Sequence, residues 1–417
     1  MGIASGHTFY DIHCHAFNLS HPSLYGFLEN LRHSNAGDLL KEVFTLSEFM
    51  PIRNLATTRR HLRNLLAVME HDVGGMFLLM EDDLSGKFRS ARDTAFLHDD
   101  VLSIGGNSYD RIILTPLLID FNTPALSADD IYYNRPPKKL LQKQIDDTLN
   151  GIRFYLKERP KGLLEIYPFI GLNPANYSLA QVQKIMNDYF GLHAISRHLF
   201  YKAFQAMNHL DVGAPISGRG LFAGLKVYPP LGFDPWPVER PEEMVKVESI
   251  YDFCEKKNIP ITTHCHDQGF LTIPIEISQE WTSPRHWRKV LFHFPKLKLN
   301  FAHFGREYTR KFGVNKHNMW YQDIIELCCE YDNVYTDISF TGGKHEFYDH
   351  LSKTFSELAS PQRRVLEGKI LFGSDFMINL LDIDSYYDYY MRFHKAPFSP
   401  YVKHKFCSEN PARFLFE

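Results

Sequence analysis

Two histidine pairs, each with a cysteine between them, stand out in this chain of 417 residues: His13-Cys14-His15 and His264-Cys265-His266. Each pair follows a short apolar segment of the kind that forms a buried strand. Side chains alternate across a strand, so both histidines of a pair point to one face and the cysteine to the other. Two imidazoles on one face can hold a divalent metal ion, although core or solvated histidines would give the same short pattern. We expect His264, at the strand end, to be a ligand and His266, further into the loop, to meet substrate or solvent.

Four further polar residues end apolar segments in the same way: Lys226, His303, Asp337 and Asp375. An isolated buried charge is very costly, so Asp375 requires a metal ion or an imidazolium. A buried lysine at position 226 similarly requires an anion or a modification. For Asp337 we favour plain hydrogen bonding at a strand end. Together with position 264, these positions are separated by 38, 39, 34 and 38 residues, which is one polar residue for each βα unit of about 30 or more residues.

The elements that would position these side chains are short strands alternating with amphipathic helices. We predict strands at residues 8–15, 224–228, 259–264, 297–303, 333–339 and 369–374, and helices at 241–257, 284–294 and 321–331. Three segments, 75–80, 111–120 and 165–172, compete for the second and third strands. This alternation predicts parallel βαβ units, and we expect a TIM-type (β/α)8 barrel with its active site at the carboxyl ends of the strands.

The first half of the chain is longer than such a barrel needs. His13 and Lys226 are 213 residues apart, which exceeds three βα units by roughly 100 residues. We place large insertions at approximately residues 19–64 and 122–161, as lids or subunit contacts. No Gly/Ser linker separates them from the rest, so residues 1–417 are expected to form a single domain.

Composition excludes several classes of function. Hydrophobic residues make up 44% of the chain and charged residues 23%, with a net charge of −3, so a folded protein is expected and a nucleic-acid partner is not. Apolar runs fall far short of the ~20 residues of a membrane span. The N-terminus carries no signal-like pattern, and the six cysteines have no scaffold spacing. Free thiols in the cytoplasm are therefore expected.

On these motifs the chain resembles the amidohydrolase superfamily, and within it the amidohydrolase-related (amidohydrolase 2) branch of metal-dependent hydrolases. The resemblance is strong from about residue 220 to the end and at the first strand, and weak between 17 and 160. The motifs that carry it are Asp11-Ile12-His13-Cys14-His15, residues 224–233, residues 261–264, Asn300-Phe301-Ala302-His303-Phe304-Gly305, Leu371-Phe372-Gly373-Ser374-Asp375 and residues 409–415.

The resemblance implies a divalent metal, with zinc first and manganese, cobalt or iron as alternatives. It makes His13, His15, His264 and Asp375 the ligands of the principal ion. His303 would bind a second ion in a binuclear centre or face the substrate in a mononuclear one. Lys226 would bridge two ions if it is carboxylated. The Gly305-Arg306-Glu307 that follows His303 departs from the small residues common in the family.

The function expected from this set is hydrolysis, by a metal-bound hydroxide, of an amide, ester or lactone bond in a small, anionic organic substrate. Asp375 would transfer the proton to the leaving group, and His303 or a second metal ion would polarise the carbonyl oxygen. Arg306 is expected to hold the substrate's charge, with Tyr228, His266 and Trp236 nearby. The alternatives are a metal-dependent non-oxidative decarboxylase of an aromatic or unsaturated acid, and a non-catalytic protein with a relic metal site. Assembly into a homo-oligomer is compatible with the insertions.

Overall fold

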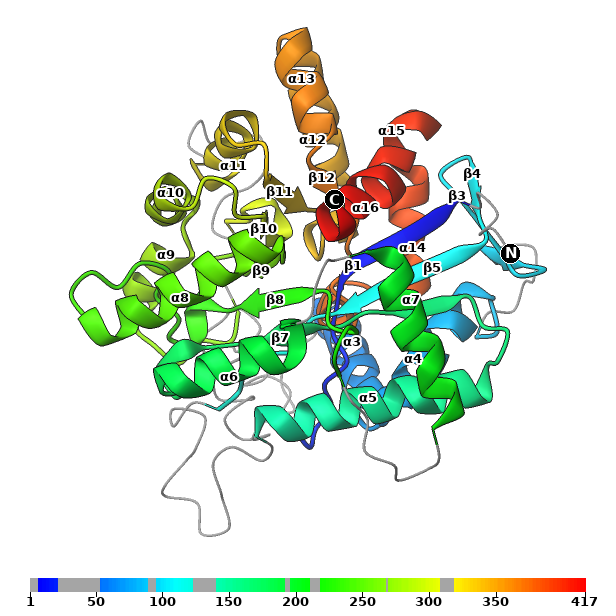
Figure 1. Cartoon of the computed structure of the whole chain (residues 1–417). Coiled ribbons are helices and arrows are strands. Elements are labelled where there is room, and N and C mark those ends of the chain that lie inside the picture. Colours follow the sequence, from blue (N-terminus) through cyan, green and yellow to red (C-terminus); the bar gives the residue numbers. More distant parts are fainter. Residues whose placement is uncertain are drawn as a thin grey trace.

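The structure is a computed structural model that describes residues 7–21, 53–88, 95–122, 140–191, 196–210, 218–267, 269–307 and 319–417. Strands and helices alternate along most of the chain, and the helices surround the parallel strands (Figure 1). The predicted insertion at 19–64 lies largely outside the described residues, as do residues 123–139 of the second one. The role of both insertions therefore stays a prediction.

Parallel strands form two sheets. The first has the order β1 (Thr8–Cys14), β5 (Arg111–Pro116), β6 (Leu164–Ile166), and its neighbours pair in parallel. The second contains β7 (Phe169–Gly171), β8 (Gly224–Val227), β9 (Ile261–Thr263), β10 (Leu299–Phe301), β11 (Val334–Asp337) and β12 (Ile370–Leu371), with neighbours in sequence also neighbours in space. The α/β class with parallel strands is confirmed, and each predicted strand of the second half is present.

The parallel pairing of the strands does not continue without interruption around a closed barrel. Between β6 and β7 stands Pro168, which has no N–H to donate to a neighbour. The register of β1 shifts between Asp11 and Cys14. Backbone hydrogen bonds nevertheless link the sheets. Among them, Leu118 N donates to Phe169 O at 3.0 Å, and Ile12 N donates to Phe372 O at 3.1 Å. The described parallel strands therefore form two sheets, which these hydrogen bonds join on two sides.

One of the three candidate strands in the first half is a helix. Residues 75–80 belong to α4 (Val73–Leu84), so the strand interpretation of this segment is wrong. Asp72 caps the helix by accepting a hydrogen bond from Gly75 N at 2.6 Å. The buried residues recur with a helical period, at positions 73, 76, 77 and 80. The other two candidates supply β5 and the β6–β7 segment.

The helices of the second half begin and end as their sequences predict. In α8 (Pro241–Lys257), proline stands in the first turn with two glutamates, two lysines stand in the last turn, and Asn258 ends the helix in the left-handed conformation. α10 (Pro284–His293) and α11 (Met319–Glu330) match the other two predictions. The remaining helices are α3 (Arg53–Met69), α5 (Leu141–Glu158), α6 (Leu179–Phe190), α7 (Arg197–Ala206), α9 (Ile275–Thr282), α12 (His345–Glu357), α13 (Ser360–Glu367), α14 (Tyr386–Lys395), α15 (Pro400–His404) and α16 (Asn410–Phe416).

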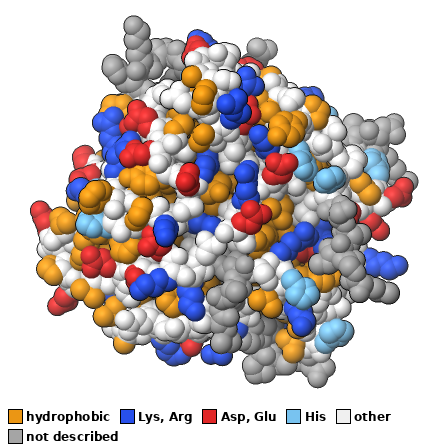
Figure 2. Space-filling model, turned by 45° about the horizontal axis from the view of Figure 1, so that its top comes forward, with side chains coloured by type: hydrophobic (Ala, Val, Ile, Leu, Met, Phe, Trp, Pro, Cys, Tyr) orange, Lys and Arg blue, Asp and Glu red, His pale blue; other side chains and the backbone are white. Residues whose placement is uncertain are grey.

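Three further short strands, β2 (Leu97–His98), β3 (Val101–Ile104) and β4 (Asn107–Tyr109), form a small antiparallel sheet. The six cysteines are all unpaired, as predicted. Within the described part of the chain, no helix has both the length and the apolar character of a membrane span. On the face shown in Figure 2, acidic and basic side chains are interspersed, which agrees with the small net charge.

Candidate metal centre

Three predicted ligands come together where β1 and β12 end. His13 Nε2 lies 3.2 Å from Asp375 Oδ1, and His15 Nε2 lies 3.1 Å from the same oxygen. All three side chains are buried, and their ligand atoms lie within 4.8 Å of one another. Gly373 permits this close approach, because a Cβ at that position would lie 2.6 Å from His13 Cβ. The geometry is that of a candidate site for one metal ion.

The other ring nitrogens decide what these histidines can bind. His15 Nδ1 lies 2.8 Å from Leu117 O, and His13 Nδ1 lies 3.0 Å from Asp337 Oδ2. A carbonyl and a carboxylate only accept hydrogen bonds, so each Nδ1 carries the proton and each neutral ring leaves Nε2 as an acceptor. Two acceptor nitrogens and the Asp375 oxygen then face one another, an arrangement that requires a cation between them. This donor set fits a divalent metal ion, with the outer contacts that metal-binding histidines commonly have.

His264 and His303 lie beside this group. His303 Nε2 is 3.2 Å from His264 Nδ1, and the ring centroids of His303 and His13 are 5.0 Å apart. His264, predicted as the fourth ligand, thus contacts His303 and lies outside the close group formed by the other three. Burial lowers the pKa of His303 to about 4, so this ring is neutral at pH 7.

The backbone is left-handed at two of these positions. His303 has φ 63° and Asp375 has φ 61°, a conformation that costs roughly 1–2 kcal/mol for a residue with a Cβ. Residues held in this way are concentrated at functional sites, where the conformation aims a side chain. Burial tends to raise the pKa of Asp375, but its close contacts with His13 and His15 outweigh burial and hold this pKa well below the usual value. Asp375 is therefore an anion at neutral pH.

Lys226, on β8, is a buried cation near the same centre. Its side chain is 1% exposed, and its Nζ has no hydrogen-bond partner among the described residues. Nζ lies 5.7 Å from the ring centroid of Tyr228. Burial lowers the pKa of Lys226 to about 8, so the amine is mostly protonated at pH 7. Such a buried cation requires either an anion, which a bound substrate would supply, or carboxylation of Nζ, which would remove the positive charge.

Three of the four residues predicted to bind substrate lie around this centre. The ring of Tyr228 stacks on His264 with 4.4 Å between centroids, and the His266 ring is 5.9 Å from that of His303. The backbone of Arg306 pairs with that of His266. Trp236 instead stacks on His293 at the end of α10, with 4.7 Å between centroids, and no described contact joins it to the histidines of the candidate metal centre.

Sequence reasoning missed a group of aromatic side chains at the same end of the strands. Phe17, Phe121 and Phe270 form this aromatic cluster, with ring centroids 5.4 to 6.3 Å apart. Phe17 also lies 5.6 Å from His15, and Phe270 lies 6.3 Å from Tyr228. Only the place of Phe17, two residues after His15, was a usable signal in the sequence. The other two follow different strands, and the fold brings them together.

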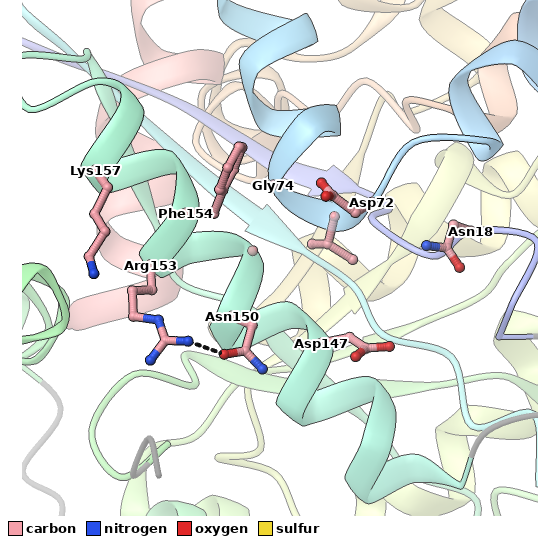
Figure 3. Close-up of a pocket in the computed structure, with 10 residues that line it drawn as sticks. Asn18, Asp72, Gly74, Asp147, Asn150, Arg153, Phe154 and Lys157 are labelled. Atoms are coloured by element: carbon pink, nitrogen blue, oxygen red, sulfur yellow. Dashed lines mark hydrogen bonds between the residues drawn. The ribbon is translucent and has the colours of Figure 1, made fainter. Parts of the chain in front are cut away.

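A separate cavity of about 370 Å³ lies between α4 and α5 (Figure 3). Arg153 donates a hydrogen bond to Asn150 Oδ1 at 2.7 Å on its wall. None of the predicted site residues lines this cavity. The residues that line it are Asn18, Asp72, Val73, Gly74, Asp147, Asn150, Gly151, Arg153, Phe154 and Lys157.

Several proteins of known structure are similar to this chain. No curated protein matches the chain. Among the solved structures to which the chain is similar is a 5-carboxyvanillate decarboxylase from Novosphingobium aromaticivorans with manganese and 4-hydroxy-3-methoxy-5-nitrobenzoic acid (11% identity, 100% of this chain and 97% of that chain covered, TM-score 0.45). Another is a 5-carboxyvanillate decarboxylase from Sphingomonas paucimobilis (9% identity, 98% of each chain, TM-score 0.46). A third is a probable 2-pyrone-4,6-dicarboxylic acid hydrolase from Acinetobacter baumannii with citric acid bound (11% identity, 98% of each chain, TM-score 0.42).

Similarities this remote assign no reaction to the chain. The family model described as amidohydrolase, however, matches residues 217–416, the part that contains Lys226, His264, His303 and Asp375. The members of this family are metal-dependent enzymes that act on small molecules. The similarity to the amidohydrolase family therefore covers residues 217–416, which include four of the predicted site residues.

Proposed function

We propose that this protein is a metal-dependent hydrolase that cleaves an amide, ester or lactone bond in a small, anionic organic substrate. The observation that carries the proposal is the meeting of His13 Nε2, His15 Nε2 and Asp375 Oδ1 within 3.2 Å contacts. These residues would hold a divalent ion, for which zinc is our first choice and manganese, cobalt or iron the alternatives. His264 and His303 lie next to them as further nitrogen donors.

We also propose that residues 1–417 form one (β/α)8 barrel with the insertions at its active-site end or at subunit contacts. The hydrogen bonds that join the two sheets on two sides support closure of the strands into a barrel. The position of the histidines at the carboxyl ends of the strands supports it too, since barrel active sites are built there. Six unpaired cysteines favour the cytoplasm as the protein's location.

When bound, a divalent ion would act as a Lewis acid and lower the pKa of water from 15.7 to about 7. Asp375, an anion beside both histidines, would then accept a proton and deliver it to the leaving group. His303 Nδ1 lies 3.2 Å from Ser339 O, which only accepts, so the neutral ring has no proton on Nε2 for the carbonyl oxygen. This tautomer favours His303 as a ligand or base over the polarising role expected from the sequence. Lys226 is the cation that could hold the oxygen instead.

A specific observation favours the second candidate, a non-oxidative decarboxylase of an aromatic acid. The aromatic cluster lies beside His15 and Tyr228, and its members are buried. Flat apolar rings are bound well by offset or edge-on contacts with phenylalanine. A substrate with its carboxylate at the metal and its ring against Phe17 and Phe270 would use both features.

Metal content and product analysis test these proposals together. Protein purified without chelator should contain about one or two equivalents of a divalent metal. Incubation with a panel of lactones, amides and aromatic acids should then give either a new acid with an alcohol or amine, or carbon dioxide. If carbon dioxide is the only new product besides the decarboxylated ring, the decarboxylase proposal is right and the hydrolase proposal is wrong. If the protein binds no metal in a titration, the hydrolase and decarboxylase proposals are both wrong, and a non-catalytic protein with a relic site is the remaining interpretation.

The variant Arg306→Ala is expected to weaken the binding of anionic substrates only. A charged hydrogen bond to a carboxylate contributes about 1.5–3 kcal/mol, so KM should rise about 10- to 100-fold for carboxylate substrates and little for neutral analogues. Steady-state kinetics on matched acid and amide pairs measures this. Arg288→Ala is the control, because Arg288 pairs with Glu326 and Glu330 on the outer helices. If Arg306→Ala affects both substrate classes equally, Arg306 does not read charge.

A further inference from the structure

Asp337, at the end of β11, lies at the centre of a buried hydrogen-bond network beneath the candidate metal centre. Its Oδ2 lies 3.0 Å from His13 Nδ1 and accepts a hydrogen bond from Asn300 Nδ2 at 2.7 Å. Its Oδ1 accepts from the backbone N–H groups of His303 and Ser339, both at 3.0 Å, and from the Ser339 hydroxyl. Asp337 is completely buried, and every one of these neighbours donates to it.

The number of hydrogen bonds that Asp337 accepts decides whether it is a metal ligand or a hydrogen-bond partner of the histidines. His13, His303 and Asp337 have ligand atoms close enough to hold a metal ion themselves. However, a carboxylate has about four acceptor positions, and five donors already point at Asp337. No lone pair is left for an ion. The network is therefore one of hydrogen bonds, and its effect falls on the two histidines.

The protons in the network have one consistent arrangement. Because Asp337 only accepts, His13 must carry its proton on Nδ1, and Ser339 must direct its hydroxyl proton to Asp337 Oδ1. The Ser339 oxygen, which lies 2.9 Å from His303 Nδ1, then accepts from that ring as well. Both imidazoles are thus held with a protonated Nδ1 inside the network and a bare Nε2 outside it.

We propose that Asp337 is a positioning residue that sets the tautomer of His13. It supports that of His303 through the Ser339 hydroxyl, next to the Ser339 carbonyl that lies 3.2 Å from the same Nδ1. This inference rests on the metal centre proposed above. It assigns to Asp337 more than the strand-end hydrogen bonding expected from the sequence. Outer partners of metal-binding histidines typically change metal affinity 10- to 100-fold when they are replaced.

The isosteric variant Asp337→Asn gives the sharpest test. Its amide oxygen would stay with the fixed N–H groups of His303 and Ser339, so its NH₂ would face His13 Nδ1. Asn300 can accommodate this by turning its amide, because its Oδ1 has no hydrogen-bond partner among the described residues. His13 would then accept at Nδ1 and carry its proton on Nε2, the atom that faces Asp375. A carboxylate-to-amide change beside a catalytic histidine is known to impose the wrong tautomer in this way.

Zinc affinity and histidine tautomers are the two measurements. Competition with a chromophoric chelator should show zinc bound about 10- to 100-fold more weakly by Asp337→Asn than by the unmodified chain. In ¹⁵N-histidine-labelled, metal-free protein at pH 8, the His13 signals should change from Nδ1–H to Nε2–H, with His13→Gln identifying them. Asp323→Asn is the matched control, since Asp323 is a buried carboxylate paired with Arg285 on the outer helices. Its zinc affinity should not change.

Failures of the two proposals are distinguishable. If the unmodified chain binds no zinc, the metal centre is wrong. If it binds zinc and Asp337→Asn binds equally well with an unchanged His13 tautomer, the positioning role is wrong. Should Asp337→Asn not fold, the unmodified protein still decides, because a His13 that carries its proton on Nε2 there would overturn the inference.

Discussion

Replacing His13 and His15 together with alanine should abolish metal binding while the fold survives. The two rings supply two of the three acceptor atoms that meet within 3.2 Å contacts. Loss of one outer partner already costs about 10- to 100-fold in affinity, so loss of two direct ligands should cost well over a hundredfold. Elemental analysis of the purified variant should find less than about a tenth of the metal in the unmodified protein, and activity should disappear with it.

The control is a double variant of exposed histidines, His98→Ala with His345→Ala. It should keep both metal and activity, which separates a local loss from a general effect of removing imidazoles. Circular dichroism should show the same secondary structure in both double variants. Full metal occupancy in the His13/His15 variant would refute the ligand assignment.

Lys226→Met should stabilise the metal-free protein and remove its activity. Burial lowers the pKa of folded Lys226 from the ordinary 10.5 to about 8. A shift of this size corresponds to about 3 kcal/mol against folding at pH 7, and methionine of similar length removes it. Because the folded pKa is the lower one, the cost is complete below pH 8 and fades as the pH rises from 8 to 10.5.

Urea unfolding in the presence of chelator measures this difference. The advantage of Lys226→Met should be about 3 kcal/mol at pH 7 and roughly half of that at pH 9.5. Lys246→Met is the matched control, since Lys246 is also buried but donates to Pro174 O, Tyr177 O and Glu243. That variant should be less stable than the unmodified protein. A destabilised Lys226→Met would mean that the folded chain already stabilises Lys226, either by a bound anion or by carboxylation of Nζ, which removes its positive charge.

The chain's local features could be predicted from its sequence. Neighbouring residues alone determine the strand that carries His13 and His15. The same holds for the two ends of α8, which begins at a proline and ends before an asparagine. The regular spacing of polar strand ends can also be read directly from the sequence. Alternation along a strand also placed His13 and His15 on one side, and both contact Asp375. Residues 75–80 were misjudged because a short apolar run fits a strand or a buried helix equally well.

What only the tertiary structure decided is which strand ends meet at hydrogen-bond distance. The sequence predicts that His264 joins His13 and His15 as a ligand, and the fold shows in addition that His264 Nδ1 lies 3.2 Å from His303 Nε2. From the sequence alone we expect only strand-end hydrogen bonds for Asp337, because 324 residues separate it from the His13 ring that it contacts. Periodicity shows that a side chain points inward but not how far it lies from side chains on other strands. That distance depends on strand register, on the left-handed turns at His303 and Asp375, and on the contact that Gly373 permits.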